Sequence, residues 1–247
     1  MTRCRWTSAR LASTVGARVV ASLLAGGLLL PAAAPALAHP HGKTTAREPS
    51  FPAPARPVAP TVSPRWSTED EREHVGEAEK VIAALGSLKG LTVADVGAGE
   101  GYYEPHLSRA AGPRGRVIAE DIDAATVAKL ARRVAPLGNV RTLLGRADNA
   151  GLPVDSTDVV LMVHMYHEIA QPYAMLWRLR DGLRAGGRIA IVDAERPTAD
   201  HGTPPKLLTC ELAAIGFVRQ STRVIENGIY LAVFVPRAVP ATIVPCR

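Results

Sequence analysis

The stretch Val93-Ala-Asp-Val-Gly-Ala-Gly-Glu-Gly-Tyr102 carries most of the information about the fold of this chain. It begins within an apolar run, residues 91–96, which predicts a buried parallel strand with Asp95 near its end. Glycines at 97, 99 and 101 follow, and a helix is expected from about Tyr103. Glycine accepts positive φ and lets backbone approach a ligand closely, and the first N–H groups of a helix have no partner within it. The stretch therefore predicts a strand, a ligand-binding turn and a helix.

A second apolar strand, Arg116-Val-Ile-Ala-Glu-Asp-Ile-Asp123, ends in acids about twenty residues beyond the glycines. A carboxylate at the tip of this strand is placed to accept hydrogen bonds from ribose hydroxyls. Tyr102 stands where the dinucleotide fingerprint needs its third glycine, so the pattern is D-x-G-x-G-x-G instead of G-x-G-x-x-G. This pattern resembles motif I of the class I S-adenosylmethionine-dependent methyltransferases. A tight glycine turn in another α/β protein is the alternative.

The resemblance implies a set of residues that hold S-adenosyl-L-methionine. Asp121 would bind the ribose, with its neighbour Glu120 as the alternative, and Asp148 would hold the adenine amino group. Aspartate is also an ordinary turn former, which weakens the second assignment. The full predicted cofactor set is Asp95, Gly97, Gly99, Gly101, Asp121, Ile122, Asp148 and His164.

The rest of the chain alternates predicted strands and helices. Strands are expected at 140–144, 156–163, 188–192, 217–222 and 229–235, and helices at 171–183 and 205–215. Gly186-Gly187 is expected to stop the first of these helices, and Asn227-Gly228 predicts a hairpin before the last strand. The resemblance covers roughly residues 70–236. It implies an α/β fold with a doubly wound, mostly parallel seven-stranded sheet whose last strand is antiparallel.

The segment His164-Met-Tyr-His-Glu168 follows the fourth strand, where this family presents the methyl group. Methyl transfer is an in-line displacement, so the enzyme mainly supplies proximity and alignment. A general base helps only when the acceptor must lose a proton. His164 is predicted to line the cofactor, and His167 is the candidate base, with Glu168 or Tyr103 orienting it. The predicted catalytic set is therefore His167, His164 and Tyr103, and the alternative for His167 is a satisfied histidine at the start of a short helix.

No metal is predicted. The spacing of His164, His167 and Glu168 differs from H-E-x-x-H, in which two histidines share one helix face. The carboxylate-rich set of catechol-type methyltransferases is not found either.

Composition limits the possible partners. The formal charge is +6, but residues 1–38 hold four arginines and no acid, which leaves 25 basic and 23 acidic residues. No basic stripe interleaved with aromatic residues is visible, so no nucleic-acid partner is predicted. An apolar fraction of 47% is that of a soluble globular protein. The oligomeric state stays open.

The amino-terminal 38 residues have the pattern of a secretory signal. Basic residues lead, residues 19–30 are uncharged and largely apolar, and Ala36-Leu-Ala38 fits the cleavage rule. The run is short for a membrane span, although an uncleaved anchor or a wrongly assigned start codon are alternatives. We therefore predict an exported protein, the alternative being a cytoplasmic or membrane-anchored one. The predicted parts are a signal (1–38), a proline-rich linker (39–66), a methyltransferase domain (67–236) and a tail (237–247).

Two further expectations concern the ends of the domain. Ser67-Thr-Glu-Asp70 resembles a capping box that starts one helix running to Leu85 and closing the cofactor pocket. Cys4 would leave with the signal, so Cys210 and Cys246 remain. A disulfide between them would tie the tail to the last helix, but two separate thiols are the expected state.

The sequence thus predicts methyl transfer from S-adenosyl-L-methionine to a small-molecule acceptor, since the domain has hardly any inserts for a polymer. An exported module that keeps the fold and binds a nucleoside-like ligand without catalysis is the alternative, because the cofactor is made in the cytoplasm. A transferase similar to spermidine synthase is a weaker third reading.

Overall fold

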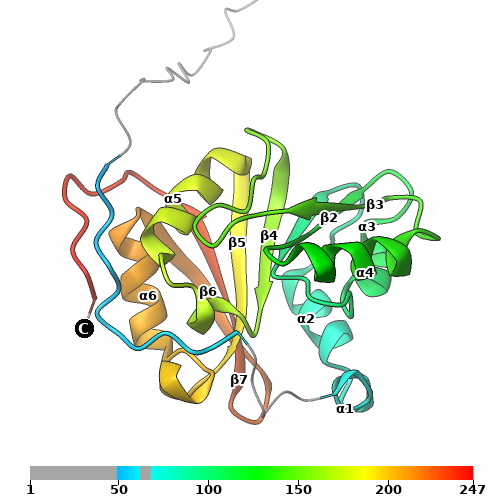
Figure 1. Ribbon diagram of the computed structural model, residues 1–247, viewed down its shortest axis with the longest axis horizontal. Helices are drawn as coiled ribbons and strands as arrows, with labels where there is room; N and C mark the ends of the chain where they lie inside the picture. The colour runs from blue at the N-terminus through cyan, green and yellow to red at the C-terminus, as the bar shows by residue number, and fades with distance from the viewer. Residues whose placement is uncertain (1–48, 62–67, 247) are drawn as a thin grey trace, which may run out of the picture. The chain divides into compact units, whose positions relative to one another are not determined.

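The computed structural model describes residues 49–61 and 68–246, which form one compact unit. The predicted signal and the first and last parts of the predicted linker, residues 39–48 and 62–66, lie outside the described residues. Figure 1 shows a central sheet flanked by helices. Its strands are β1 (Thr92–Val96), β2 (Arg116–Asp121), β3 (Val140–Leu144), β4 (Thr157–Val163), β5 (Leu183–Ala194), β6 (Phe217–Glu226) and β7 (Ile229–Pro236). Its helices are α1 (Glu69–His74), α2 (Glu77–Leu85), α3 (Glu104–Ala111), α4 (Ala124–Val134), α5 (Pro172–Gly182) and α6 (Pro205–Ala214), with single 3-10 turns η1 (Tyr166–Glu168) and η2 (Thr198–Asp200).

The strand order is β3-β2-β1-β4-β5-β7-β6. Strands β1 to β5 pair in parallel, and β7 lies antiparallel between β5 and β6. The order reverses between β1 and β4, and ligands of such sheets bind at the carboxyl ends of the strands near this point. The predicted fold, a mostly parallel seven-stranded sheet with an antiparallel last strand, is confirmed.

Both faces of the sheet are covered, which explains the apolar runs of its central strands. All five residues of β1 are buried. Side chains from α2, α3 and α4 form one core with one face of the sheet, and side chains from α5 and α6 form a second core with the other face. In Figure 1 these two sets of helices lie on opposite sides of the sheet.

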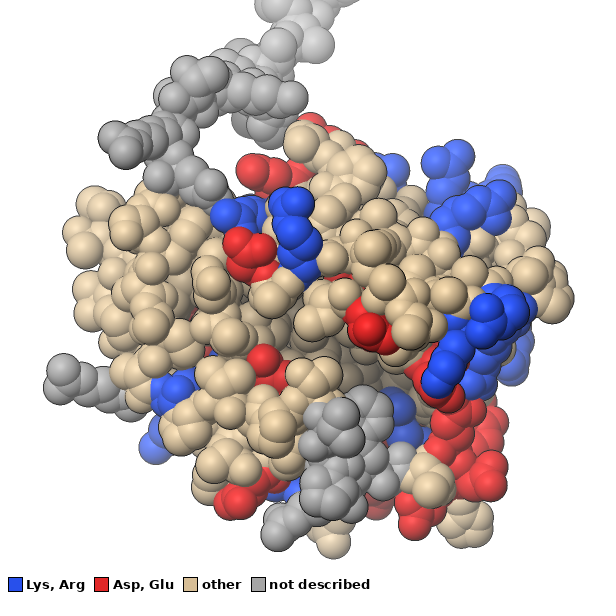
Figure 2. All heavy atoms as spheres, viewed as in Figure 1, with Lys and Arg blue, Asp and Glu red and all other residues tan. Residues whose placement is uncertain are grey.

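The helix predicted before β1 is broken into two. Gly76 has a φ of 64° and separates α1 from α2, because this left-handed conformation cannot continue a helix. The capping box is formed by Thr68 and Glu71, one residue later than Ser67 and Asp70. Glu69 of α1 pairs with Arg133 of α4 at 2.6 Å, and Figure 2 shows acidic and basic side chains together on this side of the molecule.

A second boundary also differs from the prediction. Helix α5 ends at Gly182, and β5 begins at Leu183, so Gly186-Gly187 lies inside the strand instead of stopping the helix. The pairing of β4 with β5 shifts between Thr157 and Val159, at this same end of the strand pair. Strand β6 likewise extends to Glu226, beyond the predicted end at residue 222.

Residues 49–61 were predicted as linker, but they are docked on the domain. The guanidinium of Arg56 is buried against the carboxylate of Glu211 in α6 (Nε to Oε1, 3.0 Å). It also donates to the carbonyl oxygens of Tyr166 and His167, and the N–H of Ala59 donates to His167 O at 3.1 Å. We call residues 49–61 the strap; Figure 1 shows it in blue beside α6.

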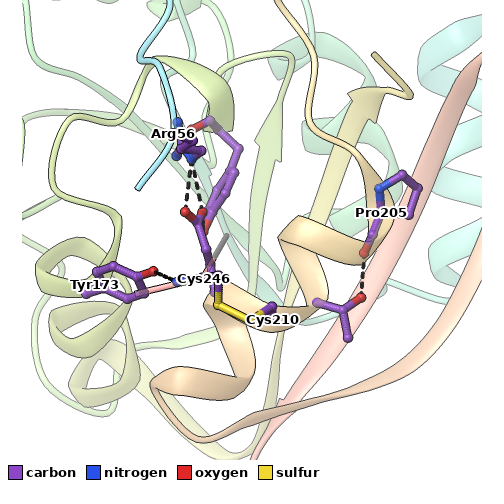
Figure 3. The surroundings of a disulfide bond; sticks show 8 residues. Arg56, Tyr173, Pro205, Cys210 and Cys246 are labelled. Carbon is purple, nitrogen blue, oxygen red and sulfur yellow. Dashed lines mark hydrogen bonds and ion pairs between the residues drawn. A yellow bond between two sulfur atoms is a disulfide. The ribbon is translucent and has the colours of Figure 1, made fainter. Parts of the chain in front are cut away.

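The carboxyl-terminal tail is also fixed, and the expectation of two separate thiols is wrong. Cys210 of α6 and Cys246 form a disulfide, with their Cα atoms 5.9 Å apart. The N–H of Cys246 donates to the hydroxyl of Tyr173 in α5 at 2.9 Å. Figure 3 shows Tyr173 beside Cys246 and Arg56 above the disulfide, so the strap and the tail are both attached close to Cys210.

Among residues 49–61 and 68–246, no helix has the length and apolar character needed to cross a bilayer.

Candidate functional site

The glycine turn lies against the end of β2. Gly97, Gly99 and Gly101 all have positive φ, at 75°, 58° and 93°. The N–H of Gly99 donates to Oδ2 of Asp121 at 3.0 Å, and the N–H of Ala98 donates to the carbonyl oxygen of Glu120 at 2.7 Å. The two segments that the sequence predicted to share a ligand are therefore directly bonded.

The three glycines have different surroundings. A Cβ on Gly97 would lie 2.9 Å from the side chain of Met165, and one on Gly101 would lie 2.6 Å from Leu130 of α4. A Cβ on Gly99 would meet nothing within 4 Å. Gly97 and Gly101 thus allow the turn to pack against the protein, whereas Gly99 faces open space, where a ligand can approach the backbone.

Asp121 and Glu120 are distinguished by burial. Glu120 is 1% exposed, accepts from the N–H of Gly97 at 3.3 Å, and has its pKa raised to about 8 by this burial. Gly145 leaves room for it, because a Cβ there would overlap Oε1 of Glu120. Asp121 is partly exposed, and Ile122 beside it is exposed. Asp121, the predicted ribose ligand, is therefore the acid of β2 that reaches the surface.

Asp95, which the sequence predicts to be a cofactor-binding residue, is buried. It is 3% exposed and faces Glu104, the first residue of α3. Burial, reinforced by the charge of Glu104, raises the pKa of Asp95 well above its usual range, and burial raises the pKa of Glu104 to about 7. The two carboxyls form a pair beneath the glycine turn.

Asp148 follows β3, as predicted, but its carboxylate is already engaged. Arg178 of α5 contacts Oδ2 of Asp148 at 2.5 Å and donates to its carbonyl oxygen at 2.8 Å. Both side chains keep contact with solvent. The predicted adenine contact would therefore share this carboxylate with Arg178.

His164 directly follows β4 in a strained conformation, with a φ of 52°. Its Nε2 lies 3.1 Å from Oε2 of Glu77 in α2, and the Tyr103 hydroxyl donates to Oε1 of Glu77 at 2.9 Å. Burial alone would raise the pKa of Glu77, but the contacts with His164 and Arg72 outweigh burial and lower the pKa to about 2. Helix α2 thus fastens the start of the segment that follows β4.

His167 is built into a different part of the site, and its orienting partner is neither Glu168 nor Tyr103. The imidazole is 2% exposed, and its Nδ1 lies 3.0 Å and 3.1 Å from the two carboxylate oxygens of Asp193, at the end of β5. Asp193 also accepts from the N–H of Ala194 and the hydroxyl of Thr203, both close to 2.8 Å. Because an ionised carboxylate only accepts, Nδ1 carries a proton, and in the neutral imidazole the lone pair is then on Nε2.

Two further groups lie near this lone pair. His167 Nε2 is buried without a hydrogen-bond partner among the described residues, and the same is true of Oε1 of Glu168, 3.9 Å away. The ring of His201 lies edge-on to that of His167, with centroids 5.5 Å apart. Burial, followed by the charges of Asp193 and Asp121, raises the pKa of Glu168 to about 8.

Sequence reasoning missed two members of this group. Asp193 was not among the predicted site residues, although an acid that closes an apolar strand of a parallel sheet does point to the carboxyl edge. His201 follows η2, in a loop with no sequence pattern that marks it; its φ of 57° is visible only in the structure. An open depression of about 360 Å³ between α2 and β6 is lined by none of the candidate site residues. The candidate site is therefore defined by the carboxyl ends of the strands and not by this depression.

Comparison with known proteins agrees with this geometry. Residues 93–187 match a family described as a methyltransferase domain. A methyltransferase of Aquifex aeolicus, described as dependent on S-adenosylmethionine, superposes with a TM-score of 0.62 and 25% sequence identity over 66% of this chain and 91% of that one. The fold is that of the class I methyltransferases. In this methyltransferase fold the glycine turn, Asp121 and the segment after β4 stand at one edge of the sheet.

Similarity to curated proteins is lower and partial. The demethylmenaquinone methyltransferase of Lactococcus lactis subsp. lactis is 27% identical over 121 residues, which is 48% of each chain. A ubiquinone/menaquinone biosynthesis C-methyltransferase of Pasteurella multocida is 26% identical over 122 residues, 48% of this chain and 46% of that one. The similarity thus spans about half the length of these relatives.

Proposed function

We propose that this protein transfers a methyl group from S-adenosyl-L-methionine to a small-molecule acceptor. The observation that carries the proposal is the junction of the glycine turn with β2, where Gly99 N–H meets the carboxylate of Asp121 beside open space. Such a junction lets backbone approach the cofactor closely while a carboxylate receives its ribose hydroxyls. The similarity to methyltransferases over residues 93–187 supports the same activity.

Methyl transfer requires the protein mainly to align the two reactants. The methyl carbon leaves the sulfonium as the acceptor atom attacks in line, so alignment of the two reactants supplies most of the rate. Where the acceptor must also lose a proton, we assign its removal to Nε2 of His167. The carboxylate of Asp193 holds Nδ1–H and keeps the lone pair on Nε2, as a base oriented by a carboxylate requires.

The test is transfer of labelled methyl from S-adenosyl-L-methionine. The purified protein is incubated with the labelled donor and an extract of its host, which is then divided into a low-mass fraction and a polymer fraction. The proposal expects label in the low-mass fraction, and none when Gly99→Val protein is used as the control. Label only in protein or nucleic acid would refute a small acceptor. Donor binding without any transfer would favour the non-catalytic binding module.

We also propose that the protein is exported. The pattern of residues 1–38 supports this, and so does the disulfide between Cys210 and Cys246, because such bonds persist in oxidising compartments. Cleavage after Ala38 would leave His39 as the first residue. Mass spectrometry of the protein from its native host tests this, and an intact amino terminus on a cytoplasmic protein would refute it.

A further inference from the structure

The buried Nε2 of His167 has neighbours that proton transfer does not need. A base requires one lone pair and one orienting carboxylate, which His167 and Asp193 already provide. Yet His167, Glu168 and His201 each place one potential ligand atom in a group whose members all lie within 4.8 Å of one another. Two imidazoles and one carboxylate are a common ligand set for a divalent transition metal with an open coordination position.

We propose that His167, Glu168 and His201 bind a divalent transition-metal ion, with zinc as the first ion to test. Two of the three side chains are more than nine-tenths buried, and their ligand atoms, Nε2 of His167 and Oε1 of Glu168, have no hydrogen-bond partner among the described residues. Unsatisfied buried nitrogen and oxygen atoms cost free energy. An ion between them would satisfy both.

The outer contacts of the group suit a metal site. Metal-bound histidines usually donate their second N–H to a carboxylate, which fixes the tautomer and makes the ligand nitrogen more basic. Asp193 does this for His167, and Asp193 is itself held by Thr203 and the N–H of Ala194. Thr203 is fixed in turn, because the hydroxyl of Tyr230 donates to its carbonyl oxygen at 2.7 Å.

The required movement is small. With bonds of about 2.0–2.1 Å in a tetrahedral site, ligand atoms lie roughly 3.3 Å apart. His167 Nε2 and Glu168 Oε1 are 3.9 Å apart, and no pair in the group exceeds 4.8 Å. Binding therefore requires these atoms to approach one another by roughly 0.6 to 1.5 Å, which rotation about the side-chain χ angles can supply. Metal and proton would compete for the same nitrogen, so the base role proposed above for His167 applies only to the metal-free protein.

A second group of residues provides a matched control. His106 lies 3.4 Å from Glu73 and 3.3 Å from Glu79 and also has the composition of a metal site. Its two carboxylates are more than half exposed and pair with His106 itself, so we expect no tight binding there. The variant His106→Gln therefore tests whether any bound metal belongs to the exposed group.

The experiment is titration of the purified full-length protein with Zn²⁺ against a chromophoric chelator, together with the visible spectrum of the Co²⁺ form. The inference expects one ion per chain, retained in His106→Gln. In Glu168→Gln and His201→Gln the affinity should fall by more than about 100-fold, the upper end of the loss from an outer-shell change. Circular dichroism identifies a variant that has not folded. If either Glu168→Gln or His201→Gln fails to fold, the metal affinity of the other variant tests the inference.

Absence of a tightly bound ion, or binding that survives both Glu168→Gln and His201→Gln, would overturn the inference. Loss of metal binding in His106→Gln, with binding kept in the other two variants, would also overturn the inference. Metal binding does not depend on the methyl donor, and S-adenosyl-L-methionine binding is measured on the same samples. If the protein binds metal but not S-adenosyl-L-methionine, this inference stands and the proposed function is refuted. If it binds S-adenosyl-L-methionine but no metal, the proposed function stands and this inference is refuted.

Discussion

At the scale of single residues, substitutions at Gly99 and Gly101 distinguish an effect on ligand binding from an effect on stability. Both have positive φ, so a side chain strains the backbone at either position. Gly99 faces open space, whereas a Cβ on Gly101 would lie 2.6 Å from Leu130. The same kind of substitution should therefore have different consequences at two positions only two residues apart in the chain.

Gly99→Val is expected to abolish cofactor binding while the fold survives, because the new side chain occupies ligand volume. Gly101→Val is expected to lower stability itself, because it collides with α4. Thermal unfolding with and without S-adenosylhomocysteine distinguishes the two effects, since a ligand that binds only the folded state raises its stability. Stabilisation of Gly99→Val equal to that of wild type would show that the glycine turn binds no ligand.

Glu120 makes a prediction about pH. Its pKa is raised by burial from 4.5 to about 8, so between these values the folded state holds a proton that the unfolded state releases. The contribution of this group to stability is present below about pH 4.5 and is lost as pH rises toward 8. Glu120→Gln is neutral throughout, so its stability relative to wild type should increase from about pH 5 to about pH 8.5. Urea unfolding at the two pH values measures the difference in the free energy of unfolding between Glu120→Gln and wild type. A difference that is the same at both pH values would contradict the raised pKa of Glu120.

At the scale of elements, the sequence predicts features that depend on residues close together in the chain better than contacts between residues far apart in the chain. Strands β1, β2 and β4 and the glycine turn follow from local patterns of apolar residues and glycines, and their positions were close to those observed. The strap could not be predicted, because Arg56 and Glu211 are 155 positions apart and proline-rich composition usually indicates a free linker. The partnership of His167 with Asp193 and the approach of His201 also depend on how β4 and β5 pair, which no local pattern specifies.

The strap should contribute substantially to stability. Arg56→Ala removes one partner of a buried ion pair, and among the described residues it leaves the carboxylate of Glu211 with the Tyr166 hydroxyl alone, at 2.8 Å. Such a loss typically costs about 3–5 kcal/mol. The double variant Arg56→Met, Glu211→Gln keeps an acceptor for Tyr166 and buries no unpaired charge, so it should be less destabilised. A cost for Arg56→Ala below about 1 kcal/mol in urea unfolding would show that the strap is not docked in solution.

At the scale of the whole molecule, the disulfide closes a loop that contains the last two strands, β6 and β7, and the tail. The bond joins residues separated by 36 positions and holds the tail on α5 and α6. For a loop of this length, the chain-entropy model gives roughly 3–4 kcal/mol of stabilisation. The whole fold is thus fastened at both ends, by the strap and by the tail, next to the same helix α6.

Replacing Cys246 by serine should therefore lower the free energy of unfolding by that amount and leave cofactor binding intact, because the bond is remote from the glycine turn. Protein isolated from its host without reductant should show no free thiol at Cys210 or Cys246. Two reactive thiols in the folded protein would contradict the pairing and remove one support for export.

The central claim is that the glycine turn and Asp121 form the site for the methyl donor, and calorimetric titration with S-adenosylhomocysteine tests it most directly. Wild type should bind with micromolar affinity. Asp121→Ala should weaken binding by about 1.5–3 kcal/mol, because it removes a charged hydrogen-bond acceptor of the ribose, and the loss of the bond to Gly99 N–H acts in the same direction. No binding by wild type, or equal affinity in the two proteins, would contradict the account.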